Sequence, residues 1–545
     1  MNEKRLILKK RDQIVVRMYG QGFGDCFLLA FPRLKETGKQ DLKNPVYIVI
    51  DSGVFYQTPG DRERMRVVAE SINLATGGKV DLLIATHEHH DHLCGFEYAQ
   101  EEWKKIQVQR IWLAWTEDAK HPATQKYDQE KNALQLQAEM ALELAHAYGE
   151  KDPALQQILQ RVRGLAAFAG DEDAGVQPLL KAKGKIHRPD KVSKLPDRVL
   201  DDFAMTPGKR FEAHIKTERD FCEPGHVRTV PATGVDAYVL GPPTAEGRLA
   251  QDLVVSEVYP EDEPTGKSSD ETKTLTLKAL AKRLELAAAS DRAERETIGA
   301  ALQKHLRMLK ADETEIVVDT GAPFRNNMSL SYPMARQRGF FQTHYFRGKS
   351  FQQIETEWLR GFGRLALQVD KVINNTSLVL AFRLPDQRVL LFVGDAQVGN
   401  WLSWHEIEKK DWRRPDGGQV DYRPTAAELL AATVVYKVGH HGSHNATLKD
   451  RGLEMMQDGL IAFVPTSRVF PQEQNHWNIP LSNLTEALWR KTGGRVIFPH
   501  EHPEYSYLNS QFNKRVEFAK EKFAPMVQKE KVIEDAVPIW RQVRI

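Results

Sequence analysis

The stretch THEHHDHLCGF, residues 86–96, gathers four histidines and one aspartate within six positions. It continues from VDLLIAT (80–86), a short apolar run typical of a strand that is buried on both faces. A loop after such a strand can turn polar side chains toward one point, and imidazole with carboxylate is a donor set for zinc, manganese or iron. We interpret four of the five as metal ligands rather than as a surface histidine cluster, and His90 as a bystander. The four are His87, His89, Asp91 and His92.

The totals describe an ordinary globular chain. Its 545 residues are 41% hydrophobic and 28% charged. That composition allows a sizeable core, and the length suggests about two to four domains, or one large domain with insertions. The 76 basic residues nearly balance the 74 acidic ones. A nucleic-acid footprint is therefore expected only as a local patch.

The cysteines and the apolar segments bear on the compartment. Cys26, Cys94 and Cys222 are too few and too dispersed for a disulfide framework, and they favour a reducing environment. The N-terminal MNEKRLILKKRDQ has no apolar segment of signal-peptide length. No run approaches the roughly 18 apolar residues of a spanning helix. We expect a cytoplasmic protein without membrane association.

Strand-like and helical segments alternate along the chain. Segments with the apolar pattern of β-strands occur in the first hundred residues, near 234–243 and between 375 and 441. Helices are expected over 62–75, 129–168, 275–290 and 296–310. This order predicts an α/β domain with helical insertions. The predicted divisions are 1–128 (first half of the fold), 129–220 (helical insertion), 221–245 (return to core strands), 246–364 (second, helix-rich insertion), 365–520 (second half) and 521–545 (C-terminal tail).

Two later strands end on similar chemistry. LFVGDA (391–396) delivers Asp395 behind a glycine. An acid there can bridge two cations, although alone it would more often cap a turn. YKVGHHGSHN (436–445) ends on three histidines. Because three separate strand ends carry histidine or aspartate, we expect them to converge on one metal site. The three histidines are His440, His441 and His444.

Together these stretches resemble the metallo-β-lactamase superfamily, whose HxHxDH motif is matched by residues 87–92. Further stretches are similar to its ComEC-type branch, the DNA-internalisation metallohydrolases. That family usually has GQGD where this chain has an additional Phe-Gly pair. The blocks lie within about 1–100 and 365–500. They are GQGFGDCFLLAF (20–31), IDSG (50–53), NNTSLVL (374–380) with GDA (394–396), and KVGHHGS (437–443).

The resemblance implies an αββα sandwich, in which two β-sheets face each other, helices lie outside, and two divalent ions, zinc or manganese, bind at one edge. The HHGS motif would supply the last ligand, with its first histidine the first choice. The other histidine would then be an oriented neighbour of the ligand. The implied ligands are His87 and His89 for the first ion, Asp91 and His92 for the second, Asp395 as a bridge, and His440 or His441.

Four positions depart from the family pattern or imitate it. Cys94 stands where better-known members have glycine, and we interpret it as a small packed residue rather than a soft ligand or a reactive thiol. Asn374 and Asn375 stand where a third histidine usually serves the first ion, and an amide oxygen is a poorer zinc ligand than imidazole. We expect that ion to be bound more weakly, or to be a harder ion such as manganese. His226, in a PGH sequence, is interpreted as a loop residue.

The resemblance implies hydrolysis by a metal-bound hydroxide at a binuclear centre. The favoured substrates are phosphodiesters in nucleic acid or nucleotides. One alternative is a small ester, thioester, lactone or lactam, and another is a non-catalytic, metal-stabilised interaction module. The helical insertions could hold a protein partner. The expected catalytic residues are Asp91, which would orient the hydroxide, His441, and Lys437 and His444, which would contact phosphate or protonate the leaving group.

Overall fold

The computed structural model describes most of one compact unit of the chain. The described residues are 3–55, 58–128, 217–251, 254–259, 337–342, 371–467, 479–500, 510–528 and 531–545. The first unit comprises Met1–Asn132, Arg163–Glu263 and Gln368–Ile545, and the second comprises Ala133–Val162 and Pro264–Leu367. Of the second unit, only the short helix α14 (Gly339–Phe341) is described. The helices predicted over 129–168, 275–290 and 296–310 lie outside the described residues.

One sheet combines the N-terminal strands with the C-terminus. Its order is β16-β19-β1-β2-β3-β5-β7-β8. Pairing is antiparallel from β16 to β3 and parallel from β3 to β8. The strands are β1 (Val15–Tyr19), β2 (Phe27–Leu34), β3 (Gln40–Ile50), β5 (Leu82–Ile84), β7 (Arg110–Ala114), β8 (Glu218–Cys222), β16 (Glu517–Phe518) and β19 (Trp540–Arg544).

The second sheet combines the strands predicted near 234–243 and between 375 and 441 with three further strands. Its order is β15-β14-β13-β12-β11-β10-β9, with parallel pairing from β12 to β15. The strands are β9 (Val227–Thr229), β10 (Asp236–Gly241), β11 (Val379–Arg383), β12 (Val389–Phe392), β13 (Thr433–Lys437), β14 (Ile461–Phe463) and β15 (Val496–Ile497). Two separate pairs join β4 (Lys79–Val80) to β6 (Gln107–Val108) and β17 (Met526–Gln528) to β18 (Lys531–Glu534).

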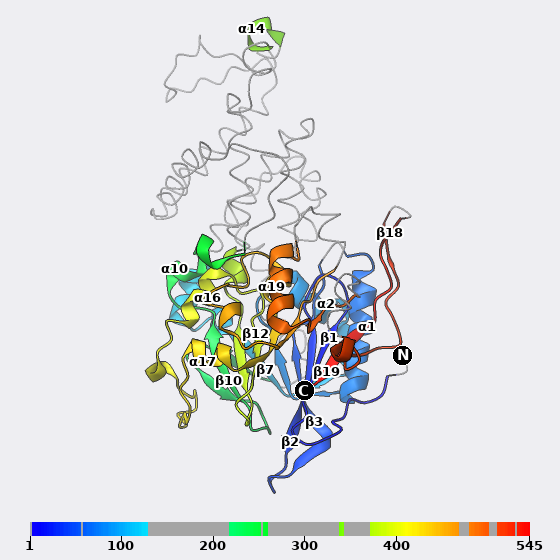
Figure 1. Cartoon of the computed structure of the whole chain (residues 1–545), viewed down its shortest axis with the longest axis vertical. Coiled ribbons are helices and arrows are strands. Elements are labelled where there is room, and N and C mark those ends of the chain that lie inside the picture. The colour runs from blue at the N-terminus through cyan, green and yellow to red at the C-terminus, as the bar shows by residue number, and fades with distance from the viewer. Residues whose placement is uncertain are drawn as a thin grey trace. The chain divides into compact units, whose positions relative to one another are not determined.

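Helices cover the outer faces of both sheets, as Figure 1 shows for α1 and α2 beside the blue strands and α16 and α17 beside the yellow and green ones. The α-helices are α1 (Asp61–Thr76), α2 (His90–Tyr98), α3 (Gln100–Trp103), α10 (Glu246–Leu249), α16 (Val398–Trp404), α17 (Ala426–Ala431), α19 (Ser482–Thr492) and α20 (Ser510–Asn513). Short 3₁₀ turns are η1 (Trp115–Glu117), η2 (Val255–Glu257), η6 (Lys409–Asp411), η7 (Gly439–Gly442) and η8 (Leu453–Met455).

Three apolar clusters separate four layers. The central cluster lies between the sheets, where Phe27 of β2 packs against Phe392 of β12 with ring centroids 5.5 Å apart. Neighbouring residues on one strand enter different clusters: Leu29 joins the central cluster, whereas Leu28 joins the cluster under α1 to α3. This alternation with a period of two explains why the strand text is continuously apolar. The predicted αββα sandwich is confirmed.

The chain ends give one finding that the sequence did not suggest. Residues 521–545, predicted as a tail, contain β19, which pairs with β1 in the first sheet. Its sequence WRQVR shows no clear alternation of apolar and polar residues. One of its charged residues, Arg544, pairs with Glu517 on β16 instead of packing in the core. The predicted boundary at 220/221 also falls inside β8.

Candidate metal centre

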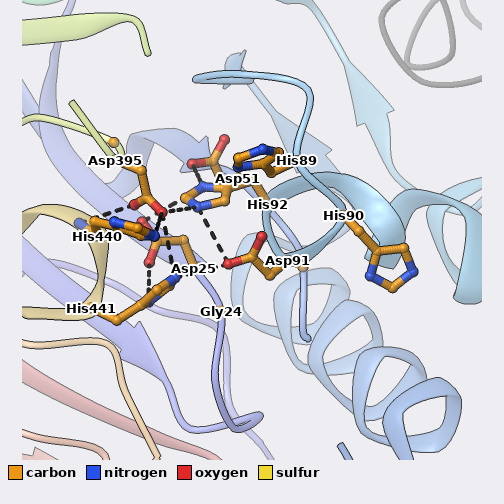
Figure 2. Close-up of polar contacts among 12 residues, drawn as sticks. Gly24, Asp25, Asp51, His89, His90, Asp91, His92, Asp395, His440 and His441 are labelled. Atoms are coloured by element: carbon orange, nitrogen blue, oxygen red, sulfur yellow. Dashed lines mark hydrogen bonds and ion pairs between the residues drawn. The ribbon is translucent and has the colours of Figure 1, made fainter. Parts of the chain in front are cut away.

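Five chain segments meet at one edge of the two sheets (Figure 2). From the first sheet come the β1–β2 connection with Asp25, the end of β3 with Asp51, and the segment from β5 into α2 with the histidine run. From the second sheet come the end of β12 with Asp395 and the end of β13 with the HHGS motif. The run is only partly a loop: α2 begins at His90, so Asp91 and His92 lie on its first turn.

Glycines bring these segments together. A Cβ atom on Gly53 would lie 2.4 Å from the carbonyl oxygen of Asp91, and one on Gly24 would lie 2.7 Å from the same oxygen. Side chains at both positions would therefore push α2 away from the ends of β1 and β3. The backbone amide of Asp25 donates to that Asp91 carbonyl over 3.0 Å. The glycines of the GQGFGD and IDSG blocks thus set how closely the acids and histidines approach.

Four residues form a compact donor group whose nitrogen and oxygen atoms lie within 4.8 Å of one another: Asp25, His92, Asp395 and His441. All four are buried. Within it, Asp395 Oδ2 lies 3.1 Å from His92 Nε2 and 3.5 Å from His441 Nε2. Two ligand atoms about 2.0–2.1 Å from a tetrahedral zinc ion are about 3.3 Å apart. The spacing therefore suits three ligands of one ion.

The two imidazoles are held with Nε2 toward Asp395. His92 donates from Nδ1 to Asp51 Oδ2 over 2.8 Å, and His441 donates from Nδ1 to the carbonyl of Pro465 over 2.7 Å. Since both partners can only accept, each Nδ1 carries the proton and each Nε2 keeps a lone pair when the ring is neutral. This is the tautomer that a metal-binding histidine with an Nε2 bond requires.

Several polar atoms of the group make no hydrogen bond within the described part of the chain. They are Asp25 Oδ1, His92 Nε2 and Asp395 Oδ2, and the same holds for Asp91 Oδ1 beside the group; all are buried. Buried polar atoms without hydrogen bonds cost free energy, so their accumulation at one point indicates a ligand there. A divalent cation fits these donor types and their spacing.

Comparison with known families agrees with this site. Residues 46–132 match the family model described as the metallo-beta-lactamase superfamily. The matched segment begins within β3, continues through α1, β5 and α2, and so includes Asp51 and the HxHxDH run. The chain has no significant match among curated proteins or among solved structures. The match, the confirmed fold and the donor group together indicate a metal-dependent hydrolase.

The charge at this site also favours cations. Burial lowers the pKa of His92, but the surrounding carboxylates, first that of Asp395, raise it well above its usual value. Without cations, protons on His92 and His441, whose pKa values are both raised, offset the acids, and a divalent ion can replace those protons. Four carboxylates and one ammonium are buried there: Asp25, Asp51, Asp91, Asp395 and Lys437.

A second pair of donors lies beside the four-residue group. His87 Nε2 and His89 Nδ1 are 3.1 Å apart, again the spacing of two ligands on one ion. Burial lowers the pKa of both, so both rings are neutral. Asn375 does not complete this pair, because its Oδ1 accepts from the amides of Gln397 and Asn400 at the start of α16. The preceding residue, Asn374, is also buried.

The two HHGS histidines differ in their position relative to the donor group. His441, the second choice from the sequence, belongs to the donor group, whereas His440 Nε2 lies 3.9 Å from Asp395 Oδ2. Both residues have positive φ, 40° and 55°, a strained conformation for histidine that turns the two rings in different directions. His444 is half-buried three residues further on.

Three other residues noted in the sequence make contacts that do not involve the donor group. His90 points away from the centre in Figure 2, toward the Tyr98 hydroxyl and the Val54 carbonyl. Cys94 Sγ is buried 3.3 Å from that same carbonyl, and burial raises its pKa well above the usual value, so it is a packed thiol. His226 lies between β8 and β9, where its Nδ1 accepts from the amide of Glu223.

Sequence reasoning assigned no role to Asp25 or Asp51. Asp25 lies between Gly24 and Cys26, just before the apolar strand β2, and Asp51 directly follows the apolar strand β3. Asp51 therefore shares with Asp395 a place at the end of an apolar strand, which could have indicated it from the sequence. Asp25 instead precedes a strand, and only the glycine beside it resembles the surroundings of Asp395.

Asp51 provides a test of how His92 is held. Its carboxylate accepts from His92 Nδ1, from the Thr86 amide and from the Thr86 hydroxyl over 2.7–2.8 Å. We expect Asp51→Asn to weaken divalent-ion affinity by about 10- to 100-fold, because the ring loses its charged partner. Equilibrium dialysis with elemental analysis measures the change. Asp81→Asn is the matched control: it removes another buried strand-end carboxylate, paired with Arg33, and should leave ion affinity unchanged.

Proposed function

We propose that the chain is a metal-dependent phosphodiesterase that acts on nucleic acid or nucleotides with two divalent ions, zinc or manganese. The observation that carries the proposal is Asp395 Oδ2, an acceptor without a hydrogen bond in the described residues that faces two imidazole Nε2 atoms. We propose His92, His441 and Asp395 as ligands of one ion, and His87 with His89 as ligands of the other.

Bound divalent cations lower the pKa of a water molecule and take up negative charge that develops on the substrate. Asp91 is placed to handle a proton. Without an ion, its Oδ2 accepts from the protonated Nε2 of His441 over 2.8 Å, a bond that is lost when this Nε2 binds the ion, while its Oδ1 makes no hydrogen bond in the described part of the chain. Burial raises the pKa of Asp91, but His92 and His441 lower it to about 2. The carboxylate is thus ionised and can accept a hydrogen bond from water near neutral pH.

The substrate class rests on two arguments. The blocks around residues 20–31, 374–380 and 437–443 are similar to the ComEC-type branch. In addition, carboxylates lie beside the imidazoles of the centre, and carboxylate oxygens suit harder ions such as manganese. Such ions pair well with phosphate oxygens. Among the described residues no helix has the length and apolarity needed to cross a membrane. We propose a cytoplasmic location, and the helical insertions as the surface for any protein partner.

A substrate panel tests the proposal. Purified protein is incubated with manganese or zinc and offered single- and double-stranded DNA, RNA, bis-p-nitrophenyl phosphate and nitrocefin. We expect manganese-dependent cleavage of phosphodiesters, lost on chelation and restored by adding the ion back, with about two equivalents of metal per chain. Turnover of nitrocefin without phosphodiester cleavage would overturn the substrate class in favour of small-molecule hydrolysis. Tight metal binding without any turnover would instead support the interaction module.

A further inference from the structure

Lys437 is the buried ammonium of the centre, and all of its donors are occupied. Nζ lies 2.5 Å from Asp25 Oδ2, 2.7 Å from the Gly394 carbonyl and 3.2 Å from Asp395 Oδ1. An ammonium has three N–H donors. Lys437 is 1% exposed. Lys437 therefore has no donor left for a phosphate group, which is the role that the sequence suggested for it.

Asp25 approaches the imidazoles from behind. Its oxygens lie 3.8 Å from His92 Nδ1 and 3.7 Å from His441 Nδ1. Those Nδ1 atoms already donate to Asp51 and Pro465, and the ligand atoms Nε2 point the other way. Asp25 belongs to the compact donor group, but its nearest charged partner is Lys437. Its carboxylate lies on the Nδ1 side of the two rings, away from the space that the Nε2 atoms face.

The two oxygens of Asp395 have different surroundings. Oδ1 accepts from Lys437 Nζ and from the backbone amide of His440, both over 3.2 Å. Oδ2 is left to face the two Nε2 atoms. The ammonium thus determines which oxygen of Asp395 can reach an ion, and it prevents both oxygens from binding the same ion.

The additional Phe-Gly pair of the first block holds Asp25 in this place. Gly24 has a φ of 148°, and a Cβ atom there would lie 2.6 Å from the Gly53 carbonyl. The Asp25 backbone is pinned on both sides, since its carbonyl accepts from the Gly53 amide over 3.0 Å and its amide donates to Asp91. Phe23 packs on the His441 ring with centroids 4.1 Å apart. The two extra residues therefore bring one side chain onto a proposed ligand and place the carboxylate against Lys437.

We propose that Asp25 and Lys437 form a buried ion-pair relay that positions Asp395: Asp25 holds the ammonium, and the ammonium holds Asp395 Oδ1 so that only Oδ2 is presented to the metal. Both are positioning residues in this scheme, and neither touches the ion or the substrate. The inference rests on the proposed function in one respect, that Asp395 is a metal ligand. It goes beyond that function by assigning the divergent GQGFGD block a structural role, which is to hold Asp25 against Lys437.

A double-mutant cycle read by metal binding tests the relay. Without the Asp25 charge, the ammonium is paired with Asp395 alone and competes with the cation for it. We expect Asp25→Asn to lower cobalt(II) affinity by about 10- to 100-fold. Adding Lys437→Met removes the competing charge, so the double variant should recover most of that loss. Lys409→Met, which removes an exposed ammonium paired with Glu428, is the control and should bind as the parent chain does.

The alternatives give different results. If Asp25 were itself a ligand, the double variant would bind cobalt no better than Asp25→Asn, and the relay would be overturned. If Lys437 contacted substrate, Lys437→Met would raise KM and leave the visible absorption spectrum of bound cobalt unchanged. The relay instead requires that spectrum to change, because Asp395 Oδ1 is released.

The same readouts separate the relay from the proposed function and from a folding defect. Metal binding does not depend on turnover, so the predicted coupling in a chain that cleaves no phosphodiester would overturn the proposed function alone. A chain that cleaves phosphodiesters without the coupling would overturn the relay alone. Circular dichroism reports folding. If Asp25→Asn does not fold, the cobalt spectrum of Lys437→Met decides, and an unchanged spectrum overturns the relay.

Discussion

Asp395→Asn is expected to lower metal-dependent hydrolysis by more than about 100-fold, since even residues one step removed from a metal cost about 10- to 100-fold when replaced. The amide keeps the size of the side chain and can still accept from Lys437 and His440 through one oxygen. It removes the negative charge that faces His92 and His441 over 3.1 and 3.5 Å. Hydrolysis of bis-p-nitrophenyl phosphate and metal content by elemental analysis should fall together.

The control for this variant is Asp386→Asn, which changes an exposed turn aspartate paired with Arg388. It should keep both activity and metal content. Thermal unfolding of the metal-free forms separates loss of the site from loss of the fold. A folded Asp395→Asn protein with unchanged hydrolysis would remove Asp395 from the site and, with it, the convergence of the two sheets on one metal centre.

The second large effect distinguishes two adjacent histidines. His441→Asn should lose the ion that His92 shares, whereas His440→Asn should retain it. His441 Nε2 faces Asp91 and Asp395 because its Nδ1 is held by the Pro465 carbonyl. His440 Nε2 lies farther from Asp395, at 3.9 Å. Burial lowers the pKa of His440 to about 4, so its ring is neutral and contributes no charge near neutral pH.

Asparagine is the appropriate replacement because both positions have positive φ, which asparagine tolerates better than alanine or leucine. The two variants therefore carry the same change under similar backbone strain. Metal stoichiometry is measured by elemental analysis after dialysis. Loss of the ion in His440→Asn with retention in His441→Asn would contradict the assignment and restore the order that the sequence favoured.

The fold class, and strand ends as the place of the donor residues, could be predicted from the sequence alone. Both follow from local patterns: continuous apolar runs give strands buried on two faces, and a run such as residues 87–92 places several donor atoms within a few bonds of one strand end. The helix predicted over 62–75 is present as α1, between two glycines with left-handed backbone. Asp51 follows a buried strand in the same way and was within reach of the sequence, whereas Asp25 precedes β2 and is held at the centre by backbone hydrogen bonds to Gly53 and Asp91.

The direction in which each side chain points could not be predicted from the sequence, because it depends on contacts between distant segments. The position of His441 rather than His440 in the donor group depends on a carbonyl 24 residues away, and the burial of Lys437 between two acids depends on strands from both sheets. β19 was missed because its charges are paired across the sheet instead of forming an apolar pattern. Residue spacing sets distances along one segment. Hydrogen bonds between segments set which histidine nitrogen carries the proton and which oxygen of Asp395 faces the proposed ion. These hydrogen bonds exist only after the sheets have packed.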